Sequence, residues 1–390
     1  MKVCRQPPDT LRPWVERVAG HIHDPILRLR FLKTVAPADP GRPRRWPLKF
    51  WLLAVVVFAL GLAVLIFMLT RPPLHPPRRP ANAVRRAEPA VPLPAANPHA
   101  VTDVWLVEKN GELETYSNGL RIDTRFTIAT HHRSYLAFPA NGGQPARRTE
   151  PAGIVFHTTE SPQAPFAPSE NGVLKRLGES LLEYVRRRQA YNFLIDRFGR
   201  TYRVVTESDA ANHSGYSAWA DDNWSYINLN ESFLGIAFEA VSPGTRWSAQ
   251  MNPAQVRSAA MLVEWLRGRY HIPASNCVAH AQVSVNPANM LVGMHHDWAA
   301  GLPFEELGLP DNYALPLPAL WAYGFDCDAN FTGRAGGRMQ AGIEAARAIL
   351  ARKAAAAGLS PLQYRNRLRQ RYREMKAAVQ QSQREKGESE

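Results

Sequence analysis

The 390-residue chain lacks two features that would assign it to special classes of protein. It has no internal repeat with a period of about 20 to 50 residues, which excludes solenoids and propellers. Charged residues make up only 21% and hydrophobic residues 45%, which excludes disorder throughout. At about 100 to 200 residues per domain, the length allows one large or two modest domains plus extensions.

The middle of the chain also lacks the positive charge that the whole chain carries. The net charge of +13 first suggests a nucleic-acid partner. Residues 1–49, 71–98 and 336–390 contribute +7, +4 and +7, which leaves −5 for residues 99–335. A nucleic-acid-binding protein needs a basic folded part, so this distribution argues against nucleic acid as a partner.

A run of twenty residues without a charge, Phe50 to Leu69, predicts a transmembrane helix over residues 50–70. At about 1.5 Å per residue this run spans roughly 30 Å, the thickness of bilayer hydrocarbon. A buried core helix rarely runs this long without a polar residue, and a cleaved signal peptide has a shorter apolar region and a shorter leader. We therefore expect an uncleaved anchor at the N-terminal end.

The segments outside the middle of the chain are predicted to be extensions. Residues 1–49 are interpreted as a cytoplasmic tail. Residues 71–98 contain nine prolines, which favours extended polyproline geometry and a semi-rigid linker. Residues 336–390 are predicted to be a basic helical C-terminal extension, whose last helix opens at Ser360-Pro361 and is more simply a solvated basic helix than a partner site.

Residues 99–335 alternate between strand and helix signals. Apolar alternation about Asn110-Gly111 predicts a hairpin that opens a β-rich entry segment over residues 99–150. Short apolar runs predict further strands at residues 153–157, 190–195, 200–205, 233–241 and 277–280.

Helical spacing of apolar residues predicts helices over residues 173–188 and 252–270. Asn252 and Pro253 form a typical start for the second helix. Because strands and helices alternate, the predicted fold class is α/β, a mixed β-sheet flanked by helices.

Histidines stand at the ends of two predicted strands. His157 ends one strand, His280 ends another, and the run His295-His296-Asp297 follows downstream. Catalytic zinc takes three nitrogen or oxygen ligands and keeps an open position for water, and neighbouring strand ends can supply such ligands. Spacing alone does not single out such a site.

Several other residues are predicted to have structural roles. Trp219 and Trp224 are expected in the aromatic core rather than in a groove wall, and His131-His132 at the surface. Cys277 and Cys327 would lie in an oxidising compartment, where they could form a disulfide.

Five ordered blocks resemble the zinc-dependent type 2 N-acetylmuramoyl-L-alanine amidases, which share their fold with phage amidases and peptidoglycan recognition proteins. The blocks are GIVFHTT at 153–159, YNFLIDRFG at 191–199, NHSGYSAW at 212–219, LGIAFE at 234–239, and VAH at 278–280 leading to HHD at 295–297. The resemblance implies an amidase-like catalytic domain over residues 151–335, with a mixed sheet between helices.

The resemblance implies a Zn²⁺ site with His157 as first ligand, His280 as second and Asp297 as third. The interval between the last two is longer than usual in the family, and Trp298-Ala299 stand where Pro-Gly is common. His296 is therefore the alternative third ligand. Asp297 is favoured because a carboxylate completes the family's set.

The resemblance also implies two catalytic residues. His295 stands where many members have a lysine, and a histidine can still donate to an oxyanion. Some members carry a glutamate at the position of Ala237, and Glu239 lies on the same face of that strand. Other members use a tyrosine in the block that Tyr191 matches, and Tyr191 is assigned the role.

His213 and Asn192, which lie in the matching blocks, are predicted to bind the glycopeptide substrate. For His213 the alternative is a packed, structural histidine. The implied activity is hydrolysis of peptidoglycan at the amide between N-acetylmuramic acid and L-alanine, by a water that zinc activates. The implied location is the inner membrane of a bacterium, with a single N-terminal span and the catalytic domain facing the periplasm or cell wall. Because the lysine and glutamate positions are altered, a non-catalytic, membrane-anchored peptidoglycan-binding module is the alternative.

Overall fold

The computed structural model describes residues 103–215, 217–242, 251–335 and 337–387, which all lie in one compact unit spanning Val91–Glu390. The predicted tail, anchor at residues 50–70 and proline-rich linker lie outside the described residues. No described helix is long and apolar enough to cross a membrane.

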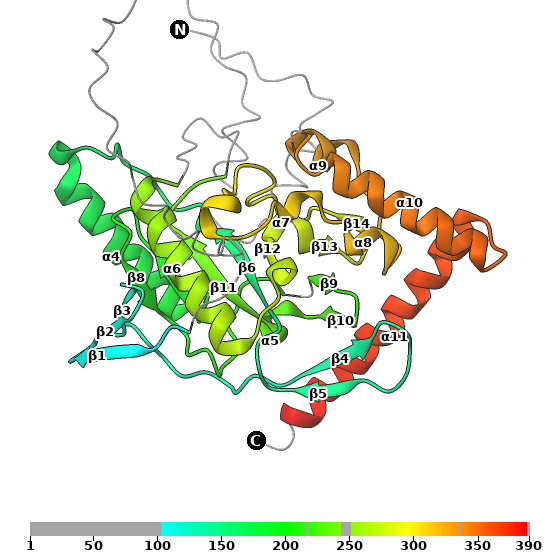
Figure 1. Ribbon diagram of the computed structural model, residues 1–390, viewed down its shortest axis with the longest axis horizontal. Helices are drawn as coiled ribbons and strands as arrows, with labels where there is room; N and C mark the ends of the chain where they lie inside the picture. The colour runs from blue at the N-terminus through cyan, green and yellow to red at the C-terminus, as the bar shows by residue number, and fades with distance from the viewer. Residues whose placement is uncertain (1–102, 216, 243–250, 336, 388–390) are drawn as a thin grey trace, which may run out of the picture. The chain divides into compact units, whose positions relative to one another are not determined.

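An eight-stranded sheet occupies the centre of this unit (Figure 1), with strand order β1-β2-β3-β8-β7-β11-β6-β12. The strands are β1 Leu106–Asn110, β2 Leu113–Tyr116, β3 Arg121–Asp123, β6 Gly153–Thr158, β7 Phe193–Ile195, β8 Thr201–Arg203, β11 Phe233–Phe238 and β12 Cys277–Ala279. Neighbours from β7 to β12 pair in parallel, whereas β7 and β8 pair antiparallel. The predicted mixed sheet is confirmed.

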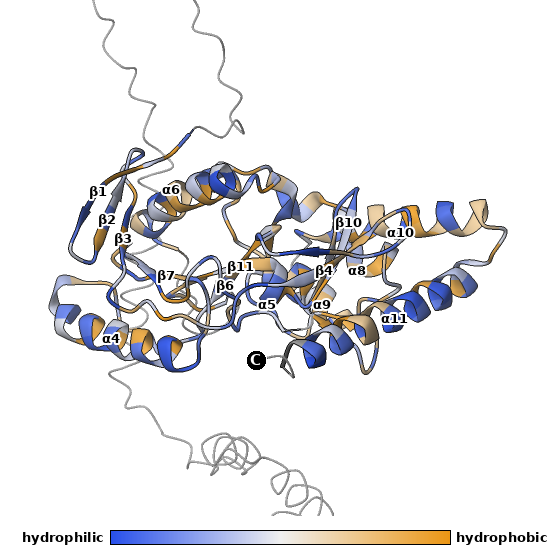
Figure 2. Ribbon diagram, turned by 90° about the horizontal axis from the view of Figure 1, so that it is seen from below, coloured by the Kyte–Doolittle hydropathy of each residue, from blue (hydrophilic) through white to orange (hydrophobic). Residues whose placement is uncertain are grey.

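Two long helices lie on opposite faces of this sheet (Figure 2), namely α4 Asn171–Arg187 and α6 Pro253–Tyr270. A capping box at Asn252 begins α6, as the sequence predicts. Alternate residues of β11 serve the two faces, because Phe238 packs in the cluster that contains α6 and Ala237 packs in the cluster that contains α4.

A four-stranded antiparallel sheet of order β5-β4-β10-β9 covers the rest of the α4 face. Its strands are β4 Tyr135–Pro139, β5 Ala146–Arg148, β9 Ala218–Ala220 and β10 Trp224–Ile227. Tyr226 and Trp219 pack against Val155 of β6 and Val278 of β12. The α4 face of β6 and β12 is therefore bounded by the small sheet on one side and by α4 on the other.

The remaining elements are short except for the last two helices. They are α5 Leu229–Ser232, α7 His280–Val283, β13 Val285–Asn286, β14 Leu291–Val292, α8 Pro318–Trp321, α9 Ala329–Arg334, α10 Gln340–Ala356 and α11 Pro361–Gly387, with 3-10 turns at Pro168–Glu170, Ala274–Asn276, Glu305–Leu307 and Asn312–Ala314.

The basic helix α11 packs against the rest of the unit through a buried stripe that includes Tyr372 and Met375. Three of its arginines bind the same unit. Arg365 pairs with Asp326, Arg369 donates to the Gly324 carbonyl, and Arg371 donates to the Pro139 carbonyl. The predicted description as a solvated basic helix is therefore wrong for the inner half of α11.

The predicted boundaries at residues 150 and 335 divide segments of one folded unit. β3 pairs with β8 and β4 pairs with β10, so the entry segment belongs to both sheets. Cys277 and Cys327 are both free, so the disulfide left open by the sequence does not form. Cys277 packs on the α6 face of the sheet.

Candidate functional site

His157 and His280 lie side by side at the carboxyl ends of two adjacent parallel strands. Ala279 of β12 is level with Phe156 of β6, so His280 follows at the level of His157. Two residues earlier, Val278 and Val155 face the small sheet, which places both imidazoles on the same face. Both side chains are buried, with ring centroids 4.4 Å apart.

Asp297 completes this pair from a loop. Its Oδ2 lies 3.2 Å from His157 Nδ1 and its Oδ1 lies 2.7 Å from His280 Nδ1. The loop is fixed by a hydrogen bond from Ala281 N to the Asp297 carbonyl. His296 turns away and stacks on Phe331, so the structure brings Asp297 and not His296 to the two histidines.

Burial and mutual contact set the charges of these three groups. Burial, with a contribution from His280, lowers the pKa of His157 to about 4. Burial alone would raise the pKa of Asp297, but His280 and His157 outweigh it and hold that pKa well below its usual range. Near neutral pH, His157 is therefore neutral and Asp297 is ionised, which are the forms that bind a metal ion.

These residues fit a divalent metal ion. The three ligand atoms all lie within 4.8 Å of one another, and two imidazole nitrogens with one carboxylate oxygen are a donor set that zinc accepts. His280 Nε2 is buried without a hydrogen-bond partner, so the only hydrogen bond that holds this ring runs through Nδ1 to Asp297. No other group of this kind occurs in the described part of the chain.

His213 lies directly behind His157. Its Nδ1 is 3.1 Å from His157 Nε2, and its Nε2 is 3.3 Å from the Phe233 carbonyl oxygen. A carbonyl can only accept, so His213 carries its proton on Nε2 and accepts from His157 through Nδ1. His157 therefore carries its own proton on Nε2, which leaves the Nδ1 lone pair free to face Asp297 and a metal.

Two neighbours fix the His213 ring. The Ser214 hydroxyl lies 2.7 Å from His213 Nδ1. A Cβ at Gly235 would come within 2.7 Å of His213 Cγ. Only glycine at this position of β11 therefore leaves room for the His213 ring. The polar atoms of the ring face His157 and the Phe233 carbonyl, and the substrate-binding role of His213 stays a prediction.

Tyr191 and His295 flank the three ligands. The Tyr191 ring centroid is 5.1 Å from that of His157, and burial together with Asp297 raises the pKa of the phenol. Tyr191 adopts a left-handed backbone conformation with φ +60. His295 is exposed and stacks on His280 with ring centroids 4.9 Å apart. Both predicted catalytic residues therefore lie beside the candidate metal site.

Asn192 is a correction to the sequence prediction. Its side chain is fully buried, its oxygen accepts from Gly235 N at 3.0 Å, and its amide group donates to the Thr206 carbonyl at 3.1 Å. The side chain is used entirely in joining backbone segments within the fold. A direct contact with substrate is excluded by this burial.

The alternative carboxylate, Glu239, lies away from the three ligands. Ala237 is the residue level with His157 on the neighbouring strand. Glu239, just after β11, accepts from Arg197 N at 3.1 Å, and burial raises its pKa to about 7. Tyr191 rather than Glu239 therefore lies against His157.

Two groups that contact His213, the Ser214 hydroxyl and the Phe233 carbonyl, were not predicted from the sequence. The only signal for either was the position of Ser214 next to His213.

The fold is of the α/β class, and two of the three candidate metal ligands, His157 and His280, lie at the carboxyl ends of parallel strands. Residues 147–297 match the family described as N-acetylmuramoyl-L-alanine amidase. This segment contains all three candidate ligands.

The N-acetylmuramoyl-L-alanine amidase AmiD of Escherichia coli (strain K12) is 34% identical over 89 residues, which are 22% of this chain and 31% of the relative. The chain therefore spans about a third of the length of that curated relative.

Two solved structures are similar at 22% identity. AmiD from E. coli in complex with the substrate anhydro-N-acetylmuramic acid-L-Ala-D-gamma-Glu-L-Lys matches with a TM-score of 0.31, over 51% of this chain and 65% of the other. AmpDH3 from Pseudomonas aeruginosa in complex with anhydromuramic pentapeptide matches with a TM-score of 0.30, over 40% and 58%.

Proposed function

We propose that this protein is a zinc-dependent N-acetylmuramoyl-L-alanine amidase that hydrolyses peptidoglycan between N-acetylmuramic acid and L-alanine. The observation that carries the proposal is the convergence of His157, His280 and Asp297 within a segment of the amidase family. The name of the E. coli relative describes the same reaction.

His157, His280 and Asp297 would hold the zinc ion. When bound, zinc polarises the scissile carbonyl and lowers the pKa of a water toward about 7, so that a nucleophile is available at neutral pH. The lowered pKa values of His157 and Asp297 mean that these two ligands need lose no proton on binding. His213 keeps the His157 ring in the tautomer that offers Nδ1.

Tyr191 and His295 would act on the carbonyl oxygen as negative charge develops there. The raised pKa of Tyr191 keeps its hydroxyl protonated, and a hydroxyl is a hydrogen-bond donor. Burial and the neighbouring His280 lower the pKa of His295, so its neutral ring offers one N–H. A well-placed donor of this kind lowers the activation free energy by about 3 kcal/mol.

The test is muropeptide hydrolysis by the full chain, followed by mass spectrometry of the released peptides. We expect chelation to abolish release of peptides that begin with L-alanine, and zinc to restore it. His157→Ala should be inactive, whereas His132→Ala, at an exposed histidine, should keep full activity. An active His157→Ala protein would overturn the proposal.

The second candidate is a module that binds peptidoglycan without cutting it. Two observations favour it, namely Ala237 beside His157 and His295 in place of the lysine that the resemblance predicts. Zinc-loaded protein that binds sacculi and releases no peptide would establish this function instead.

We also propose that residues 50–70 anchor the protein in the inner membrane, with residues 99–390 on the outer side facing the cell wall. The uncharged run from Phe50 to Leu69 supports this location. Deleting residues 50–70 should move the protein from the membrane fraction to the soluble fraction. A deletion variant that stays in the membrane fraction would contradict the anchor.

A further inference from the structure

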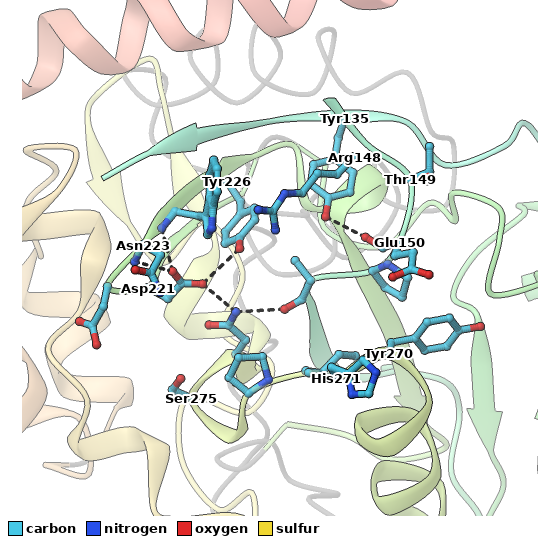
Figure 3. A pocket seen from close by; sticks show the side chains of 17 residues that line it. Tyr135, Arg148, Thr149, Glu150, Asp221, Asn223, Tyr226, Tyr270, His271 and Ser275 are labelled. Atoms are coloured by element: carbon cyan, nitrogen blue, oxygen red, sulfur yellow. Dashed lines mark hydrogen bonds between the residues drawn. The ribbon is translucent and has the colours of Figure 1, made fainter. Parts of the chain in front are cut away.

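A cavity of about 630 Å³ lies at the other end of β6 from the candidate metal site (Figure 3). Ala152, just before β6, and Asn276, just before β12, line it. His157 follows Ala152 by five positions along the strand, or about 17 Å at the usual rise of a β-strand. The cavity is of the size that binds ligands, and it is distinct from the metal site.

Arg148 offers unused hydrogen-bond donors to this cavity. Its guanidinium carbon lies 4.0 Å from the centre of the Trp224 ring, and both side chains line the cavity (Figure 3). Within the described residues, the Arg148 side chain has no ion pair and no hydrogen bond. The stacking fixes the guanidinium and leaves its N–H groups available to a ligand.

A second cavity of about 340 Å³ continues from the first. The two share the lining residues Asp221, Asp222, Ser275 and Asn276. In the second cavity, Lys353 Nζ lies 4.4 Å from the centre of the Trp321 ring. We call the two adjoining cavities the trough. Each is lined by one tryptophan with a cation stacked on it, and two such cavities side by side fit successive units of a chain.

The charged side chains that line the trough indicate which kind of polymer it can bind. Its lining holds the carboxylates of Glu150, Asp221 and Asp222 and the cations of Arg148 and Lys353. Asp221 already accepts from two backbone N–H groups, from Tyr226 and from Asn276. A polyanion would meet more carboxylates than cations, so a near-neutral chain rich in hydroxyl and amide groups fits better.

We propose that the trough binds the saccharide strand of peptidoglycan, a chain of N-acetylated hexosamines. Sugar hydroxyls both donate and accept, as the mixed charged side chains and the Ser275 hydroxyl require, and aromatic rings suit the C–H faces of sugars. The proposal rests on the proposed function for its choice of glycan. It adds a second site that holds the glycan away from the hydrolysed bond.

The experiment measures calorimetric binding of an N-acetylglucosamine hexamer to the metal-free full chain. Arg148→Gln and Asp222→Ala should each weaken binding about tenfold, because each removes a charged hydrogen-bonding group. The matched controls are Arg121→Gln and Glu179→Ala, at exposed residues outside the trough, and these should bind as the unchanged protein does. The two trough variants should also hydrolyse intact sacculi more slowly.

Two results would overturn this proposal. One is an absence of hexamer binding, and the other is equal binding by all five proteins. Binding of a free stem peptide in place of the hexamer, with the same dependence on Arg148, would assign the trough to peptide and also overturn it. Hydrolysis of a muropeptide with a single saccharide tests the proposed amidase function separately, since both trough variants should keep that activity.

Discussion

The two ends of β6 carry polar clusters that are built in opposite ways. At the amino end, Asp221 accepts four hydrogen bonds, two from backbone N–H groups, one from Tyr226 and one from Asn276. At the carboxyl end, Asp297 contacts two buried imidazoles, His157 and His280, through its side chain. The first carboxylate is surrounded by ordinary donors and joins loops, whereas the second contacts two imidazoles that could hold a metal ion with it.

This difference shows how a structural carboxylate is told from a functional one. The groups that bond to Asp221 are neutral and only donate hydrogen bonds to it. They occupy the carboxylate oxygens, which indicates that Asp221 stabilises the fold. Two buried imidazoles against one carboxylate place three possible metal ligands within 4.8 Å of one another. Such an arrangement is typical of a metal site.

The strongest test of the comparison is removal of Asp297. Asp297→Ala should lose bound zinc and slow muropeptide hydrolysis by at least about 1000-fold, because zinc supplies several kcal/mol of transition-state stabilisation. Zinc content by atomic absorption and peptide release by mass spectrometry measure both effects. His296→Ala is the neighbouring control and should keep its zinc. Zinc loss in His296→Ala with retention in Asp297→Ala would reverse the ligand assignment.

A substitution in the cluster at the amino end of β6 should change the stability of the fold and not zinc binding. Asn276 is buried, accepts from Trp219 Nε1, and donates to the Ala152 carbonyl and to Asp221. Asn276→Ala should lower the free energy of unfolding by about 3 kcal/mol, because it leaves buried polar groups unpaired. Urea denaturation measures this loss, with exposed Asn223→Ala as control. Zinc affinity of the folded protein should not change.

Glu239 is a further, buried carboxylate, and its contribution to the free energy of unfolding should depend on pH. Its pKa of about 7 in the folded protein lies above the ordinary value of 4.5, because burial disfavours the ionised form. The folded protein keeps a proton that the unfolded chain loses between these values, so stability present at low pH is lost as the pH rises through 7. Glu239→Gln should therefore be more stable than the unchanged protein at pH 8, by up to about 3 kcal/mol.

At about pH 4, the same substitution should change the free energy of unfolding little, because the carboxyl is then protonated in the folded protein. Denaturation at the two pH values measures the difference. Glu179→Gln, at an exposed position on α4, is the control and should show no pH-dependent gain. An equal gain for Glu239→Gln at both pH values would show that its carboxyl does not titrate in this range.

The smallest expected effect concerns the support of His157. His213→Ala should weaken zinc binding about 10-fold to 100-fold, the usual cost of losing a group that orients a ligand. Competition with a chromophoric chelator measures the affinity. His213→Gln, which can still accept from His157 Nε2, should recover part of the loss. Unchanged affinity in His213→Ala would show that His157 is held in place by packing alone.

Much of the fold could be predicted from local patterns. The helices α4 and α6 and the strands β6, β11 and β12 form where apolar periodicity places them, because their buried faces are continuous in the sequence. The inner face of α11 could not be predicted, because the partners of Arg365 and Arg371 lie 39 and 232 residues away. Long-range partners of this kind leave no local signal.

The candidate site divides in the same way. His157 and His280 could be placed together because each ends a buried strand, and the amidase resemblance supplied Asp297. The contact of His213 with His157 and the full burial of Asn192 could not be predicted, since both residues occur in matching blocks and yet lie in different surroundings. A motif gives the order of residues but not the layer in which each side chain lies.

The sequence by itself determined the strand-end histidines, the five ordered blocks that resemble the amidases, and the separation of basic ends from an acidic middle. These follow from periodicity, motif order and composition, which are local properties of the chain. Only the tertiary structure decided that Asp297 rather than His296 meets the histidines, that His213 orients His157, and that a trough lies at the far end of β6. Each of these depends on side chains brought together across the sheet, and that packing is a property of the whole fold.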